Sequence, residues 1–227
     1  MTIVGPSAST QSRPPAATNS RAVKVLHAVR HGITEMNVYL SKHRYYEGMK
    51  DPKLWDTRLT PEGMAGARNA SGVAATLNPK PEVLIVSPLS RALHTAELVF
   101  PHYEGPTHVE PLARERVWLS SDCGSSPRVL DGLFGSGGSG RFSFDHLPDV
   151  WWYAPRGEAR PDKIPMEPEA AFRQRVAEFK AYLLKRPEAV VAVVAHWGLL
   201  HELTGHSFDN CEIKSFELHD NGISPLN

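Results

Sequence analysis

Five short stretches of the chain are predicted to be β-strands. The strongest signal is AVVAVVA at residues 189–195, which contains no polar residue and indicates a strand covered on both faces. The run VLIV at residues 83–86 has the same character. The other three predicted strands span residues 24–29, 107–110 and 211–218. Wholly apolar runs of this length are typical of strands in a parallel sheet.

Four helices are predicted where apolar residues recur at intervals of three and four. They span residues 60–77, 87–100, 172–186 and 198–204. The first two open with threonine or serine followed by proline, which suit the N-cap and the first helical position. Residues 38–58 show no clear period and are predicted to be a loop or an irregular helix. Because strands and helices alternate, we expect one layered α/β domain over residues 23–227, with a mainly parallel sheet.

Two segments fall outside this alternation. Residues 1–22 are rich in Ser, Thr, Ala and Pro and contain no acidic residue, which predicts a disordered tail. A short organelle-targeting segment has a similar composition, but here only Arg13 and Arg21 supply charge. Residues 119–165 combine the run GLFGSGGSG with several prolines and WWY at 151–153. We interpret this stretch as an irregular, lid-like insert with a packed aromatic part and a mobile Gly/Ser tip.

The composition limits the classes of partner. Basic and acidic residues number 25 each, so the net charge of zero gives no reason to expect nucleic acid or membrane partners. No apolar run approaches the length of a membrane span. Two cysteines, Cys123 and Cys211, are too few for a disulfide framework and favour a reducing, cytoplasmic location. Local groups of arginine can still bind a small anion.

Polar residues suited to phosphate chemistry follow three of the predicted strands. Arg30 and His31 come directly after the first strand. Arg91 lies in the first turn of the helix that follows residues 83–86, and His196 follows residues 189–195. The carboxyl ends of parallel strands meet at one edge of a sheet, so we expect these side chains to lie together. A cation opposes the dipole at a helix N-terminus, but a phosphate bound there would accept hydrogen bonds from both the amides and Arg91.

Five blocks of sequence resemble the motifs of the histidine phosphatase superfamily, the phosphoglycerate-mutase-like group. The blocks are RHGITEMN at 30–37, DTRLTPEG at 56–63, SPLSRALHTA at 87–96, LARE at 112–115 and VAHWG at 194–198. They resemble that group's R-H-G-x-T-x-x-N, D-x-x-L-T-x-x-G, S-P-L-x-R-A-x-x-T-A, L-x-E and V-x-H-x-G. The resemblance implies a three-layer α/β sandwich, with a mainly parallel sheet and helices on both faces.

The resemblance also implies the role of each site residue. His31 would be the nucleophile and would form a phosphohistidine. Arg30 and Arg91 would bind the phosphate by charge and fork geometry, with Asn37 as a neutral donor. His196, when protonated, would add a further donor and so take both a catalytic and a phosphate-binding role.

A carboxylic acid completes the implied mechanism. Glu115 would protonate the leaving oxygen and afterwards activate water as a base, which requires a raised pKa. Glu110 and Asp122 are alternatives nearby in the sequence. The implied scheme needs no metal or other cofactor.

A metal-dependent hydrolase is a further alternative, because His196, His201 and His206 could be ligands. Their spacing of five does not place them on one helical face, which argues against a metal cluster. Such an enzyme would be inhibited by chelators.

Several residues near the motifs have less defined roles. Arg44, Arg58 and Arg116 could reach a substrate anion, although a surface ion pair is the common fate of such residues. Trp197 stands where the superfamily often has glycine, and would narrow the pocket or form an aromatic wall. His94 stands where glutamine is common.

The predicted function is metal-independent hydrolysis of a small phosphorylated substrate. A phosphoglycerate mutase would share the first half-reaction but must keep the intermediate dry, which a Gly-rich insert does not favour. A non-catalytic binding protein on the same scaffold would be expected to lack Arg30, His31, Arg91 or His196, and all four are present. The aromatic residues at 151–153, expected to be exposed, could still contact a partner.

Overall fold

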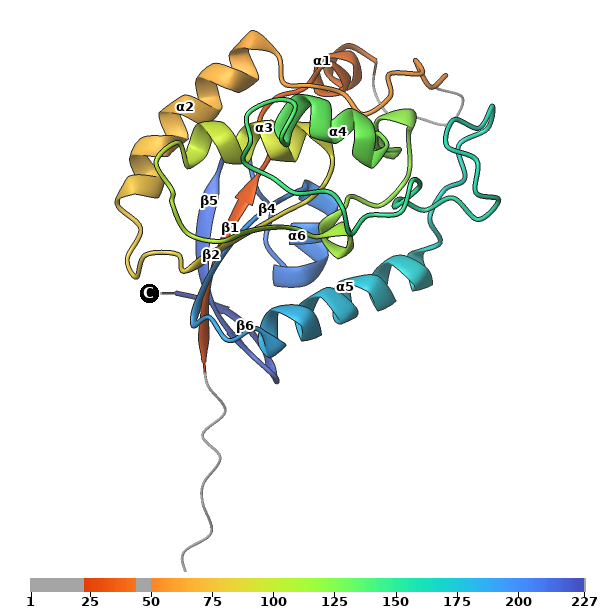
Figure 1. The fold of residues 1–227 in the computed structure, drawn as a ribbon. Helices are drawn as coiled ribbons and strands as arrows, with labels where there is room; N and C mark the ends of the chain where they lie inside the picture. Colours follow the sequence, from red (N-terminus) through yellow and green to blue (C-terminus); the bar gives the residue numbers. More distant parts are fainter. Residues whose placement is uncertain (1–22, 44–49, 227) are drawn as a thin grey trace, which may run out of the picture.

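The computed structural model describes residues 23–43 and 50–226 (Figure 1). In this part of the chain a sheet of six strands lies between two layers of helices. This architecture confirms the predicted three-layer α/β fold. The segment 1–22, predicted to be a tail, and Arg44 lie outside the described residues. No helix in the described ranges is both long and apolar enough to cross a membrane.

The sheet explains the apolar runs in the sequence. Its strands are β1 (Lys24–Arg30), β2 (Val83–Val86), β3 (Thr107–Val109), β4 (Val190–Ala195), β5 (Ile213–His219) and β6 (Gly222–Pro225). They are arranged in the order β3-β2-β4-β1-β5-β6. The first four strands in this order are parallel to one another. Strand β5 is antiparallel to β1, and β6 is antiparallel to β5. Every residue of β2 and β4 is buried because helices cover both faces of these strands.

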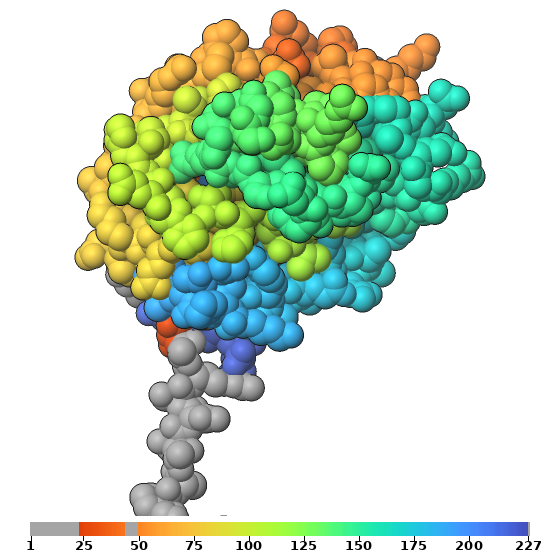
Figure 2. All heavy atoms as spheres, viewed as in Figure 1, coloured from red at the N-terminus to blue at the C-terminus, as the bar shows by residue number. Residues whose placement is uncertain are grey.

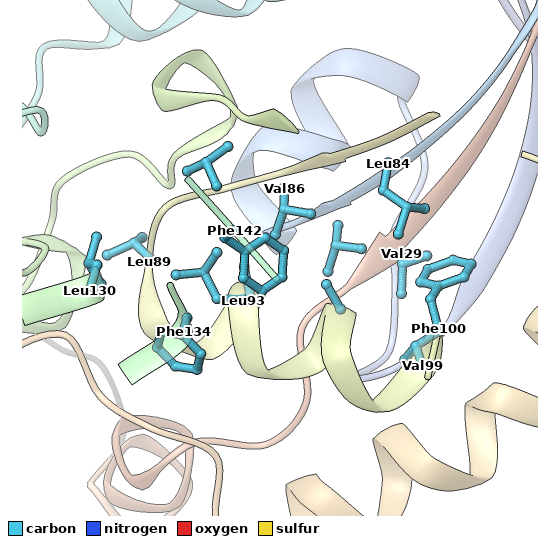
Figure 3. Packing of buried hydrophobic residues seen from close by; sticks show 14 of the residues in the cluster. Val29, Leu84, Val86, Leu89, Leu93, Val99, Phe100, Leu130, Phe134 and Phe142 are labelled. Atoms are coloured by element: carbon cyan, nitrogen blue, oxygen red, sulfur yellow. The ribbon is translucent and has the colours of Figure 1, made fainter. Parts of the chain in front are cut away.

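Six α-helices and two 3₁₀ turns connect these strands in the described residues. They are α1 (Glu35–Lys42), α2 (Pro61–Ala75), α3 (Ser90–Val99), η1 (Pro111–Ala113), η2 (Ser120–Asp122), α4 (Pro127–Phe134), α5 (Glu169–Lys185) and α6 (Trp197–Thr204). Alternate strand residues face two separate cores. Val29 and Leu84 pack with α2, α3 and α4, and Figure 3 shows part of this core. Leu26 and Ile85 pack with α5 and α6 on the opposite face.

Three local features differ from the sequence prediction. α1 occupies part of the stretch without clear period, because Thr34 and Asn37 form a capping box at its N-terminus. α3 begins at Ser90 rather than at Ser87, since Asp56, far away in the sequence, accepts hydrogen bonds from the Ser90 backbone N–H and hydroxyl at 2.8 and 2.7 Å. The strand β6 was not predicted.

The segment 119–165 is largely packed against the body of the protein. It contains α4, and Figure 2 shows it as a continuous green-to-teal band across the front of the molecule. The side chains of Trp151 and Trp152 are each only 5% exposed and belong to the core beneath α4, so the prediction of exposed aromatic residues there is wrong. The Trp151 indole donates to the Ser125 carbonyl at 2.9 Å. Only the beginning of this segment, from Leu119 to Asp122, contributes to the cavity described next.

Candidate active site

A cavity of about 500 Å³ opens where the parallel strands end. The predicted residues Arg30, His31, Asn37, Arg91 and Glu115 all line it. His196 does not line the cavity but lies directly behind it, with its ring centroid 5.2 Å from that of His31. The structure therefore brings together every site residue predicted from the sequence.

The hydrogen bond at Nδ1 of His31 determines which nitrogen can react. Nδ1 lies 2.7 Å from the carbonyl oxygen of Gly32, which can only accept, so Nδ1 carries the proton. Nε2 is then left with a lone pair. Burial and the charges of Arg91 and Arg30 hold the pKa of His31 well below 6.5. The ring is therefore neutral near pH 7, with Nε2 as the nucleophilic atom.

His196 is neutral for a related reason. The Arg91 Nε–H donates to Nδ1 of His196 at 3.2 Å, so this nitrogen has no proton. Nε2–H then donates to the Ser87 hydroxyl at 2.7 Å. Burial and the charge of Arg91 keep the pKa of His196 well below 6.5. The expected role as a protonated donor is thus not favoured in this arrangement, in which His196 orients Arg91 instead.

Arg91 is held by three acceptors at the N-terminus of α3. Besides His196, its guanidinium donates to the Ser121 carbonyl at 2.6 Å and to Asp122 Oδ1 at 2.9 Å. The ion pair with Asp122 is buried, with side-chain exposures of 5% and 9%. Burial raises the pKa of the Asp122 carboxyl, and contact with Arg91 opposes that rise. These contacts use three of the five N–H groups of a guanidinium, so two remain for a bound anion.

Two buried polar atoms of the cavity residues have no hydrogen-bond partner within the described part of the chain. They are Nε of Arg30 and the hydroxyl oxygen of Thr57. Arg30 is fixed by one other contact, from Nη1 to the Phe208 carbonyl at 2.7 Å. Unpaired buried donors are costly, and an anion in the cavity would remove that cost. Sequence reasoning missed Thr57, because it occupies a variable position of its motif.

Asn37 contributes its amide nitrogen. Its Oδ1 accepts from the backbone N–H and the hydroxyl of Thr34, both at 3.0 Å, as part of the cap of α1. The amide NH₂ is therefore the part of Asn37 available to a phosphate in the cavity. The same capping contacts fix the position of the side chain.

Glu115 has the raised pKa that a general acid needs. Its carboxylate accepts from the backbone N–H groups of Arg116 and Gly198, at 2.8 and 2.9 Å. Burial and the nearby charge of Asp122 raise the pKa above 4.5 despite these two donors. A Cβ atom added to Gly198 would lie 2.5 Å from Oε1 of Glu115, so a larger residue at this position would displace the carboxylate.

The backbone on either side of Glu115 is held by a network of hydrogen bonds and ion pairs. We call this network the Glu167 clasp; it consists of Glu167, Arg114, Arg116 and Arg175. The Arg175 guanidinium donates to the carbonyls of Leu112 and Arg114, at 2.9 and 2.8 Å, and to Oε2 of Glu167, at 2.8 Å. Arg114 donates to Oε1 of Glu167 at 3.0 Å. Arg116 Nε donates to the Glu167 carbonyl, and the Glu167 N–H donates to the Val117 carbonyl. No sequence signal had singled out Glu167 or Arg175.

The remaining candidates have other positions. Glu110 accepts from the Leu112 N–H at the start of η1 and does not line the cavity. Arg58 is exposed and also lies outside the cavity lining, whereas Arg116 belongs to it. Within residues 23–43 and 50–226, no group of three His, Cys, Asp or Glu side chains could hold a metal ion.

Comparison with known protein families gives a match for part of the chain. Residues 26–122 match the profile of the histidine phosphatase superfamily, branch 1. This match spans 97 of the 227 residues, so this part of the chain is similar to the histidine phosphatase superfamily. No curated protein gives a match.

Several solved structures share the fold. The α-ribazole phosphatase from Shigella flexneri is 22% identical, with a TM-score of 0.57 over 89% of this chain and 94% of that one. YhfR from Bacillus stearothermophilus is 18% identical, with a TM-score of 0.55 over 89% and 95%. The product of open reading frame Rv3214 from Mycobacterium tuberculosis is 17% identical, with a TM-score of 0.52 over 90% and 96%. At sequence identities this low, the similarity to these structures shows a shared fold and nothing about a shared activity.

The superfamily motifs are joined in space by contacts between them. Asp56 of the second motif accepts from Ser90 of the third. Ser87 of the third motif accepts from His196 of the last. Glu115 of the fourth accepts from Gly198 of the last. These contacts join the second, third, fourth and last motifs to one another.

Proposed function

We propose that the protein hydrolyses phosphate monoesters through a phosphohistidine formed on His31. The observation that carries the proposal is the Nδ1 contact of His31 with Gly32, which presents an unprotonated Nε2 beside two arginines. A dianionic phosphate suits the two unused N–H groups of Arg91 and the unpaired Nε of Arg30. The match of residues 26–122 to the superfamily profile supports the same class of reaction.

Two steps complete the reaction. In the first, the Nε2 lone pair forms a bond to phosphorus, the ester P–O bond breaks, and Glu115 gives its proton to the leaving oxygen. In the second, Glu115 as carboxylate takes a proton from water, the water oxygen bonds to phosphorus, and the P–N bond breaks. Inorganic phosphate leaves, and His31 and Glu115 return to their starting forms.

The pKa shifts of His31 and Glu115 favour the protonation states that the proposed first step requires of both residues. Attack requires neutral His31, and leaving-group protonation requires protonated Glu115. With ordinary values of 6.5 and 4.5, no pH would keep most molecules in both forms. The structure lowers the pKa of His31 and raises that of Glu115, so the two requirements are met together over a wider range of pH.

Glu115→Gln is expected to lower kcat/KM for an alkyl phosphate by on the order of 10²-fold, because the leaving alkoxide loses its proton donor. In the wild type, activity should rise with pH below 6.5 as His31 deprotonates, and fall at a pH above 4.5 as Glu115 ionises. The fall should vanish in the variant. The measurement is the pH profile of kcat/KM for an alkyl phosphate and for p-nitrophenyl phosphate, whose phenolate leaves without much protonation and should be less affected.

Glu110→Gln is the matched control, because Glu110 is a neighbouring carboxylate that lies outside the cavity. It should keep the wild-type profile. An alkaline limb that persists unchanged in Glu115→Gln, or equal losses with both esters, would show that Glu115 is not the acid.

The direct test of the proposed function is phosphate release by the purified protein in the presence of a chelator. The substrates are p-nitrophenyl phosphate, sugar phosphates, a phosphotyrosine peptide and 3-phosphoglycerate. Release of inorganic phosphate is expected. Isomerisation of 3-phosphoglycerate without release would identify a mutase, inhibition by the chelator would indicate a metal-dependent hydrolase, and inactivity on every compound would favour a binding protein.

Solvent access to the cavity favours hydrolysis over mutase chemistry. Trp118 and Trp197, which line the cavity, are 39% and 42% exposed. A mutase has to exclude water while its phosphohistidine waits for the second half-reaction. A cavity whose wall is this exposed admits the water that hydrolysis needs.

A further inference from the structure

The cavity has a polar floor and an aromatic rim. His31 and Arg91 are buried, with exposures of 5% and 4%, and form the floor where the phosphate group would bind. Trp118 and Trp197 line the same cavity but are exposed to solvent, at 39% and 42%. Phe172, at the start of α5, is a third aromatic residue of the lining. A phosphate monoester that reaches His31 therefore leaves its alcohol part among these rings.

The two tryptophans are unusual within the described residues. Exposed large apolar side chains in this part of the chain are otherwise aliphatic, at Val23, Val73, Val129 and Met166, and none of these lines the cavity. Both exposed tryptophans do line it. Exposing an indole to water is unfavourable, so two at one cavity mark a surface that a ligand covers.

The rings of the rim are fixed before any ligand arrives. The Trp197 indole N–H donates to the Ser207 hydroxyl at 3.1 Å, and its ring stacks on His201 with centroids 5.0 Å apart and planes inclined by 7°. Trp118 is covered on one side by the Arg116 guanidinium, 4.4 Å from the ring centroid. Rigid aromatic walls bind flat groups at a low cost in conformational entropy.

The charges at the rim do not favour a second anionic group on the substrate. Arg116 is engaged by Trp118 and by the Glu167 carbonyl. Glu202 also lines the cavity and has the opposite charge, with Arg173 3.5 Å away as its partner. The apolar residues Met36 and Leu40 of α1 complete the lining. An uncharged apolar alcohol fits this rim better than a carboxylate or a polyol.

We propose that Trp118 and Trp197 select phosphate monoesters whose alcohol part carries a planar aromatic ring. This inference rests on the proposed function. It assigns to Trp197 the role of a specificity determinant, and Trp118 supplies a second ring from a different part of the chain. Stacking of a substrate ring on these indoles contributes on top of the burial of apolar area.

The test compares benzyl phosphate with glycerol 1-phosphate. Both release a primary alcohol of similar acidity, so a difference in kcat/KM reports on recognition of the alcohol part and not on leaving-group chemistry. The wild-type protein is expected to favour benzyl phosphate by about tenfold or more, a typical size for one or two aromatic contacts. Trp118→Ala and Trp197→Ala should each lower this ratio by about fivefold. Val73→Ala, an exposed apolar position outside the cavity, should leave the ratio unchanged.

Calorimetric binding of benzylphosphonate and methylphosphonate separates failure of this inference from failure of the proposed function. These compounds cannot be hydrolysed, so they report selectivity without turnover. Selective binding of benzylphosphonate without hydrolysis of any ester would contradict the proposed function while supporting an aromatic site. Hydrolysis of both esters with equal kcat/KM, or Trp variants that keep the wild-type ratio, would overturn the inference and leave the proposed function standing. A wild-type preference for glycerol 1-phosphate would overturn the inference in the same way.

Discussion

His31→Ala is expected to abolish phosphate release, with a loss on the order of 10⁴-fold or more, because the reaction loses its proposed nucleophile. Rapid quenching of the wild-type protein with ³²P-labelled substrate should trap label on the protein. The P–N bond of phosphohistidine is labile in acid and stable in base, which distinguishes it from a phosphoserine. The variant should trap no label.

His94→Ala is a suitable control for the loss of a histidine, since His94 is half-buried on α3 and outside the cavity. It should retain turnover and labelling. Phosphate release by His31→Ala at the wild-type rate, or base-labile label in the wild type, would rule out the proposed intermediate.

Arg91→Ala is expected to reduce both activity and stability. Turnover should fall on the order of 10³-fold, because the transferring phosphoryl group loses a positioned guanidinium. The free energy of unfolding should fall by about 3–5 kcal/mol, because Asp122 would remain as a buried carboxylate without its cation. Denaturant unfolding and steady-state kinetics measure the two effects separately.

The double variant Arg91→Ala/Asp122→Asn separates catalysis from folding. An asparagine at position 122 can still accept from the Trp118 and Leu119 N–H groups, which donate to Asp122 Oδ2 at 3.1 Å. With the unpaired charge removed, most of the lost stability should return. Activity should stay low because the guanidinium is still missing. Recovery of activity together with stability would show that Arg91 has only a structural role.

The sequence was sufficient to predict the parts of the site that follow from strand ends. Arg30, His31 and His196 directly follow apolar runs that form parallel strands, so their meeting follows from the topology of the sheet. Arg91 was identified by its charge at a helix N-terminus, where its partners are now Asp122 and His196. These are local signals that a single sequence contains.

The features that the sequence did not predict depend on contacts between distant residues. The start of α3 is set by Asp56 rather than by the adjacent Ser87, and no local pattern indicates this. The neutral state of His196 depends on its burial and on the Arg91 guanidinium placed beside it. The burial of Trp151 and Trp152 depends on the core beneath α4, since a run of prolines and glycines has no period from which burial can be predicted.

The Glu167 clasp has a consequence for how this fold can diversify. Arg116 and Val117 are joined to Glu167, so the chain leaves the α/β body of the protein and returns to it at the same place. The roughly fifty residues between therefore form a loop whose two ends are held together by residues outside it. Insertions or deletions after Asp122 would change the segment that follows the cavity lining without displacing Glu115. This segment could therefore change in evolution while Glu115 stays in place.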